Sequence, residues 1–259
     1  MVSGYEFYKG PWQDTGWLVN ATHAFFTEYA PTKNIYEVTK EKIVERRKWT
    51  PTLSYYDTHF TQILEELGII YVPKQVDPGP GVLFPIPDYH QRLTHGKINP
   101  FYELLLRDQP AKYGFLGKKD AFRGPSWMGA TDEVLRLIAR YRTVILVEGP
   151  YDLLACRLLW PNAAVLSTGT KTINDMHVAY LRMLGVKTVY LLFDYESAKA
   201  GKSDGQGQIA MEIIRNTYGR TSGLRFEIAN CPNDDPAMCL EDYWGAQALR
   251  KVLVGIFPQ

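Results

Sequence analysis

Short apolar runs alternate with amphipathic stretches through the second half of the chain. Residues 144–147 are four consecutive apolar positions, and residues 188–193 form a second run that is apolar after its first residue. Such runs are typical of strands buried on both faces of a parallel sheet. Shorter runs at 164–166 and 224–228 predict two further strands. Helical spacing of apolar residues between the runs predicts helices at 132–141, 151–159, 173–184, 204–218 and 240–253.

Parallel strands that are joined by helices cross over with a right hand, so this part predicts a Rossmann-like α/β domain over residues 131–259. The first half has a less regular pattern and predicts a mixed α+β subdomain over residues 1–130. Here we expect helices at 35–48 and 55–67, strands at 69–72 and 81–86, and a turn at 77–81. Residues 1–35 are rich in aromatic residues but interrupted by Gly and Pro, which predicts an irregular or mixed segment.

Composition adds a local concentration of positive charge to this picture. The 259 residues are 46% hydrophobic and 22% charged, with a net charge of +1, as expected of a globular protein with one large or two ordinary domains. A segment at 89–123, broken by Pro and Gly and therefore predicted to be rich in loops, is nevertheless basic. Such a surface suits phosphate contacts, although a solvated face is the alternative. Its basic residues are Arg92, Lys97, Arg107, Lys112, Lys118, Lys119 and Arg123.

The cysteines and the apolar runs limit the class of protein. The three cysteines show no CxxC spacing, so we expect neither a zinc module nor a disulfide framework, which favours a reducing compartment. No apolar run approaches the ~18 residues of a membrane span, and the N-terminus lacks the pattern of a secretory signal. We therefore expect a cytoplasmic protein without a membrane partner.

Acidic residues follow the predicted strands. Glu148 comes directly after one buried strand, Asp194 and Glu196 follow the second, and Asp235 lies soon after the fourth. The carboxyl ends of parallel strands share one edge, where ligands bind in open α/β sheets. Carboxylates that gather there repel one another unless a cation neutralises them, and oxygen ligands suit Mg²⁺ or Mn²⁺. Helix capping explains each acid singly, but it does not explain why both long buried strands end in acid.

Three of these stretches also carry a family resemblance. EGPYD at 148–152, STGT at 167–170 and FDYE at 193–196 resemble the Toprim module in order and strand context. That module is shared by DnaG-type primases, type IA and type II topoisomerases, and OLD- and RNase M5-type nucleases. GVLFPIPD at 81–88, PAKYG at 110–114 and FRGPSWMG at 122–129 are similar to the N-terminal half of the DnaG-type polymerase core, and NDDPAMC at 233–239 is similar to its third acidic motif.

The resemblance implies roles for the acidic residues. Glu148 would act as a general acid or base near the metal and contribute to its binding, Asp194 and Glu196 would bind Mg²⁺ or Mn²⁺, and Asp235 would complete the cluster. Glu196 replaces an aspartate of the family pattern, Ala237 stands where bacterial primases often have another aspartate, and Arg123 replaces a lysine. We expect nucleotide or nucleic-acid contacts from Arg92, Lys97, Lys112, Lys118, Lys119, Arg123, Gly149, Asp152, Thr168 and Gly169.

The predicted function is DNA primase: synthesis of short RNA primers on single-stranded DNA from nucleoside triphosphates by metal-dependent nucleotidyl transfer. With no zinc module and no helicase in the sequence, this would be a minimal core or a phage- or plasmid-type protein that works with a replicative helicase. Two alternatives stay open: a Toprim nuclease, and a non-catalytic nucleic-acid-binding module. A topoisomerase is disfavoured because strand passage needs a cleavage domain and a gate that this length hardly accommodates.

Overall fold

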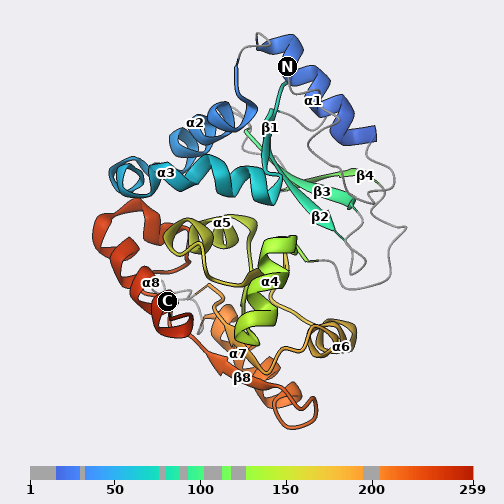
Figure 1. Ribbon diagram of the computed structural model, residues 1–259, viewed down its shortest axis with the longest axis vertical. Helices are drawn as coiled ribbons and strands as arrows, with labels where there is room; N and C mark the ends of the chain where they lie inside the picture. The colour runs from blue at the N-terminus through green and yellow to red at the C-terminus, as the bar shows by residue number, and fades with distance from the viewer. Residues whose placement is uncertain are drawn as a thin grey trace. The chain divides into compact units, whose positions relative to one another are not determined.

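The computed structural model describes residues 16–29, 33–75, 80–87, 93–101, 113–117, 127–194 and 205–258. The chain divides into two compact units, residues 1–47 with 60–123 and residues 48–59 with 124–259 (Figure 1). Helix α3 (Thr50–Leu67) therefore contributes its first ten residues to the second unit and the rest to the first. The predicted boundary at residue 130 between two functional domains stays a prediction.

The first unit is built on an antiparallel sheet with the strand order β1-β2-β3-β4. Every residue of β2 is buried, and helices α1 and α2 pack beside β1 (Figure 1). The two helices that cover one edge strand explain why this unit buries apolar side chains despite its irregular sequence pattern. The elements are α1 (Gly16–Glu28), α2 (Ile35–Arg47), β1 (Ile70–Val72), β2 (Gly81–Pro87), β3 (Leu93–Pro100) and β4 (Gly114–Gly117).

The structure makes two predictions for this unit more specific. Part of the segment predicted to be irregular or mixed forms α1, in which Leu18, Ala21 and Phe25 are buried at helical spacing. The basic segment predicted to be rich in loops contains β3 and β4. Pro100 ends β3, and glycines bound β4, so these residues mark the ends of strands and do not interrupt them. β3 pairs with β2 along its whole length, a tertiary interaction that the local pattern does not show.

The second unit contains a parallel sheet with the strand order β6-β5-β7-β8, flanked by helices (Figure 1). This confirms the predicted fold class, and β5 is the predicted buried strand. α5 is buried at all ten positions and packs against α8. The elements are α4 (Asp132–Tyr141), β5 (Thr143–Val147), α5 (Pro150–Leu159), β6 (Val165–Ser167), α6 (Asp175–Met183), β7 (Thr188–Leu191), α7 (Gln206–Tyr218), β8 (Arg225–Ile228), the 3-10 helix η3 (Met238–Glu241) and α8 (Tyr243–Ile256).

The predicted closing helix at 240–253 is instead two elements. Asp242 adopts an extended conformation between η3 and α8, and its side chain accepts a hydrogen bond from the backbone amide of Gly245 at 2.7 Å. An aspartate in this position satisfies an amide that has no partner within the helix, and so it starts a new helix. None of the helices in the described part of the chain combines the length and apolar character that a membrane span requires.

Strand register determines where the sheet presents its polar residues. Val147 pairs with Ser167 at the ends of β5 and β6, and Leu146 pairs with Leu191 at the end of β7. Because these strands run parallel, the residues that follow them emerge at one edge of the sheet. That edge receives the residues after Val147, Ser167 and Leu191, which include several of the predicted site residues.

Candidate metal and nucleotide site

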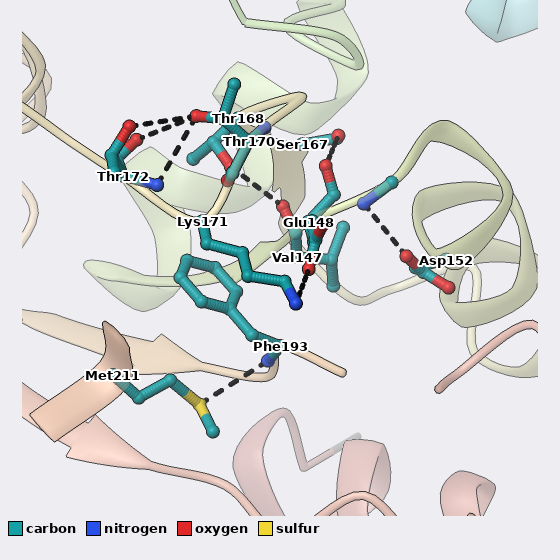
Figure 2. Close-up of polar contacts among 11 residues, drawn as sticks. Val147, Glu148, Asp152, Ser167, Thr168, Thr170, Lys171, Thr172, Phe193 and Met211 are labelled. Atoms are coloured by element: carbon teal, nitrogen blue, oxygen red, sulfur yellow. Dashed lines mark hydrogen bonds and ion pairs between the residues drawn. The ribbon is translucent and has the colours of Figure 1, made fainter. Parts of the chain in front are cut away.

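The turn after β5 brings a carboxylate back to the end of its own strand. Gly149 precedes α5 in an extended conformation, and Pro150 occupies the first helical turn, where it needs no amide partner. The backbone amide of Gly149 donates to Asp152 Oδ2 at 2.8 Å (Figure 2). A Cβ atom at Gly149 would lie 2.6 Å from that same oxygen, so only glycine allows this close approach.

Three carboxylates converge at this edge of the sheet. Asp152 comes from the first turn of α5, Asp194 follows β7, and Asp235 lies in the loop after β8. One oxygen of each lies within 4.8 Å of the others, and of the residues that the structure describes these form the only His, Cys, Asp or Glu group suited to hold a metal ion. The structure thus brings together Asp194 and Asp235, which follow separate strands.

The environment of Asp194 disfavours its negative charge. Its Oδ1 atom is buried and accepts no hydrogen bond from any residue that the structure describes. Burial raises the pKa of Asp194 to about 8, and the charges of Asp152, Glu148 and Asp235 add to the rise, whereas Lys171 lowers this pKa. A carboxylate in such surroundings needs a cation or a proton to be stable.

The donor set therefore fits a divalent cation. Asp152, Asp194 and Asp235 offer only oxygen atoms, which Mg²⁺ and Mn²⁺ prefer, and Asp194 Oδ1 has no hydrogen-bond donor among the described residues. Burial and the neighbouring carboxylates disfavour the ionised form of Asp194, and the positive charge of a divalent ion would stabilise that form.

The loop that carries Asp235 is anchored on both sides of Ala237. The Ala237 amide donates to Asp152 Oδ1 at 3.2 Å, and the Ala237 carbonyl accepts from the buried indole of Trp49 at 3.0 Å. Asp235 Oδ1 itself accepts from the amide of Met238 at 2.6 Å. These bonds hold Asp235 in place and leave its second oxygen for a ligand.

Two thiols lie at the ends of the same loop. Cys231 Sγ and Cys239 Sγ are 3.9 Å apart, and the Cys239 thiol donates to the carbonyl of Asp235 at 3.6 Å. The hydrogen bond with Cys239 and burial raise the pKa of the Cys231 thiol, so this thiol stays protonated. Cys231 therefore contributes packing and a hydrogen bond to the loop, not a reactive thiolate.

Glu148 lies beside the carboxylates of Asp152, Asp194 and Asp235, and it forms an ion pair with Lys171. Lys171 Nζ is 3.8 Å from Glu148 Oε2, and both side chains are about a quarter exposed (Figure 2). The loop after β6 holds this part of the chain in place, because Ser167 Oγ donates to the Glu148 carbonyl at 2.9 Å and the Thr168 amide donates to the Val147 carbonyl at 3.1 Å. Glu148 therefore lies between the loop after β6 and the three carboxylates of Asp152, Asp194 and Asp235.

The structure brings together Glu148, Asp152, Asp194 and Asp235, with Gly149, Thr168 and Gly169 beside them. Asp152 was predicted as a nucleotide contact, yet it belongs with the candidate metal ligands. Lys97 lies in β3 of the first unit, with its Nζ atom 5.5 Å from the centre of the Tyr113 ring. The other predicted residues lie outside the described ranges: Glu196, Arg92, Lys112, Lys118, Lys119 and Arg123.

Two residues of the site were not predicted from the sequence. Lys171 directly follows the STGT stretch and could have been noticed as a cation beside a predicted ligand loop. Trp49 had no such signal, since 188 residues separate it from its partner Ala237. The functional role of every residue named for this site stays a prediction.

Comparisons with known proteins identify the fold. The sequence matches no protein-family model and no curated protein. The structure of the zinc-binding and RNA polymerase domains of Aquifex aeolicus primase is 18% identical, with a TM-score of 0.58 over 92% of this chain and 67% of that chain. The primase fragment of the bacteriophage T7 primase-helicase protein is 15% identical, with a TM-score of 0.52 over 75% and 70%.

A third match is a DnaG primase catalytic domain bound to single-stranded DNA. It is 16% identical, with a TM-score of 0.55 over 90% of this chain and 79% of that chain. The chain thus has the fold of the DnaG-type primase catalytic core, which confirms the predicted resemblance at the level of the fold.

Proposed function

We propose that this chain is the catalytic core of a DNA primase, which makes short RNA primers on single-stranded DNA by metal-dependent nucleotidyl transfer. The observation that carries the proposal is the group formed by Asp152, Asp194 and Asp235, with Glu148 beside it, at the ligand-binding edge of the sheet in a chain with a primase-core fold. A reaction at phosphorus needs positive charge close to the phosphates, and this group can hold that charge.

Asp152, Asp194 and Asp235 would hold Mg²⁺ or Mn²⁺, with Glu196 as a further ligand. The bound ion would supply charge stabilisation at the nucleotide's phosphates. Glu148 would accept the proton of the attacking 3′ hydroxyl, a role that suits a carboxylate about a quarter exposed and adjacent to the metal ligands. We assign further nucleotide contacts to Gly149, Thr168 and Gly169, which lie beside the carboxylates.

The basic segment of the first unit would bind the template strand. Contacts of Lys and Arg with the phosphate backbone contribute to the binding of single-stranded DNA without sequence preference. The related catalytic domain bound to single-stranded DNA supports this assignment by analogy. We assign the contacts to Arg92, Lys97, Lys112, Lys118, Lys119 and Arg123.

Among the alternatives, a nuclease could use similar acids to direct water at a phosphodiester. The likeness to primase cores extends over 92% of the chain and includes the part before the acidic module, which favours the primase. A protein with this function would act in the cytoplasm, in the host cell if a phage encodes it. A replicative helicase would be its natural partner there.

The test is incorporation of labelled nucleoside triphosphates on single-stranded DNA with Mg²⁺ or Mn²⁺. We expect short RNA products from the wild type and none from Glu148→Gln or Asp194→Asn. Glu212→Gln is the matched control, because it removes a carboxylate that pairs with Arg215 on the surface of α7 and should leave synthesis unchanged. Template degradation without nucleotides would favour the nuclease, and equal DNA binding by all variants without any reaction would favour the non-catalytic module.

A further inference from the structure

The loop after β6 holds its shape through its own hydroxyl groups. Thr168 Oγ1 donates to the carbonyl of Thr170, and Thr170 Oγ1 donates to the carbonyl of Thr172 at 3.2 Å (Figure 2). The amide of Thr172 donates in turn to Thr170 Oγ1 at 3.3 Å, and Gly169 has a φ of 70°, which favours glycine. Lys171 therefore extends from a loop that is ordered by local hydrogen bonds.

The ion pair between Lys171 and Glu148 is long and partly exposed, so it is weak enough to be exchanged for another contact. Its Nζ–Oε2 distance to Glu148 is 3.8 Å, well beyond the ~2.7–2.9 Å of a charge-assisted hydrogen bond. Both side chains are partly exposed, and pairs of this kind contribute little to stability. The lysine has a flexible stem and can turn its ammonium group toward a second anion at small cost.

The positive charge of Lys171 also acts on Asp194. It opposes the rise in the pKa of Asp194 that the other carboxylates cause. Among the described residues, Lys171 faces the carboxylates of Glu148, Asp152 and Asp235, so this part of the site is negative even when Asp194 is protonated. A nucleoside triphosphate, itself an anion, would be repelled by this site until a divalent ion is present.

From these contacts we infer that Lys171 exchanges partners. In the site without metal it is a counter-ion for Glu148, and once a divalent ion neutralises the carboxylates it binds the phosphates of the incoming nucleotide. This inference rests on the proposed function and names a nucleotide-binding residue for it. It also explains why a cation lies at the edge of an acidic site and not among the three candidate ligands, which come from other elements.

The exchange predicts two effects of opposite sign when Lys171 is removed. Lys171→Ala should bind Mn²⁺ alone more tightly, because a competing positive charge has gone. The same variant should bind nucleotide more weakly, because a phosphate contact has gone. A purely structural role in the loop predicts that both affinities fall together.

The experiment is calorimetric titration of the intact protein with Mn²⁺ alone, and then with a non-hydrolysable nucleoside triphosphate analogue in the presence of Mn²⁺. For Lys171→Ala we expect a Kd for Mn²⁺ that is lower by roughly threefold and a Kd for the analogue that is higher by roughly tenfold. Lys171→Arg should stay within about threefold of the wild type for the analogue, because it retains the charge.

Lys187→Ala is the matched control. Lys187 is exposed and directly precedes β7, so it lies at the opposite edge of the parallel sheet, and its loss should change either Kd by less than about twofold. Equal losses in Lys171→Ala and Lys187→Ala would mean that only the net charge matters, which would overturn the inference.

The outcomes separate this inference from the function on which it rests. If the wild type makes primers but Lys171→Ala binds the analogue normally, the inference about Lys171 fails and the primase proposal stands. If the wild type neither makes primers nor binds the analogue, both fail. Opposite shifts in the two Kd values, together with primer synthesis by the wild type, would support both.

Discussion

The carboxylate of Asp152 accepts a hydrogen bond from the backbone amide of Ala237 at 3.2 Å, although 85 residues separate the two along the chain. Its other oxygen accepts from the amide of Gly149 at 2.8 Å. Asp152 is only 6% exposed, so both bonds are shielded from water. One side chain therefore fixes the turn after β5 and the loop that carries Asp235, and thereby positions two parts of the candidate site relative to each other.

Asp152→Asn should destabilise the protein even without any ligand. An asparagine can accept with one oxygen only, so its NH₂ group must face either the Gly149 or the Ala237 amide. We expect a loss of about 1–3 kcal/mol in the free energy of unfolding, measured by urea denaturation. Asp242→Asn is the control, because asparagine is an equally good N-cap for α8 and should change stability by less than about 0.5 kcal/mol. Equal stability of the two variants would contradict the bridging role.

Trp49→Phe should weaken metal binding from a distance. The change keeps an aromatic ring next to Tyr151 but removes the hydrogen bond to the Ala237 carbonyl, which then lacks its buried donor. We expect a loss of about 1–2 kcal/mol in the free energy of unfolding and a several-fold higher Kd for Mn²⁺, because the loop with Asp235 is less well held.

Trp160→Phe is the matched control for this prediction. It removes a hydrogen bond of the same length, 3.0 Å, from a buried indole to the carbonyl of Phe257. The stability loss should be similar, but the Kd for Mn²⁺ should stay within about twofold of the wild type. If both variants lose metal affinity equally, the effect comes from general destabilisation and not from the loop.

The parallel sheet could be predicted from the sequence because each of its strands is marked locally. Val144 to Val147 are apolar and fully buried, and Glu148 follows directly at the edge where ligands bind. The same rule placed Asp194 and Asp235 at that edge. A strand that is buried on both faces can be predicted in this way because its continuous apolar composition differs from that of loops and surface helices.

Strands β3 and β4 of the antiparallel sheet and the support of the site could not be predicted in the same way, whereas β1 and β2 lie where strands were predicted. β3 contains Gly96 next to Leu83, where a Cβ atom would come within 2.6 Å of Leu83 Cδ1, so the glycine reflects packing against β2 and not a loop. Trp49 reaches Ala237 through the tertiary fold alone. Residues that act through such long-range contacts are not marked by any pattern in the adjacent sequence.

The contribution of Asp194 to the stability of the metal-free protein should fall as the pH rises from about 4 to about 8. The pKa of Asp194 is 3.8 in the reference state and about 8 in the fold. Between these values the folded state retains a proton that the unfolded state has released, so stability is greatest at the acidic end and is lost as the pH rises. Below this range both states are protonated, and above it both are ionised.

Asp194→Asn should remove most of this pH dependence. We expect the variant to be more stable than the metal-free wild type at pH 8 by about 1–2 kcal/mol, a value that allows for solvent screening of a partly exposed carboxylate. Saturating Mn²⁺ should stabilise the wild type at pH 8 but not the variant. Parallel pH profiles for the two proteins, measured by urea denaturation, would contradict the assignment of the raised pKa to Asp194.

Gly207→Ala should displace Asp194 without touching its side chain. Gly207 lies in the first turn of α7, and a Cβ atom there would collide with the backbone carbonyl of Asp194. Because backbone cannot rotate away as a side chain can, α7 and the end of β7 must move apart, which we expect to cost about 1–3 kcal/mol. The Kd for Mn²⁺ should rise at least severalfold, since Asp194 no longer meets Asp152 and Asp235.

Gly255→Ala distinguishes this steric effect from the general effect of the substitution. Gly255 lies near the end of α8, and a Cβ atom there would meet no other atom within 4 Å, so alanine should stabilise the helix by about 0.5–1 kcal/mol. Its Kd for Mn²⁺ should equal that of the wild type. If Gly207→Ala keeps both its stability and its metal affinity, the contact between α7 and the Asp194 backbone does not position this carboxylate, and Asp194 must be held by its own strand alone.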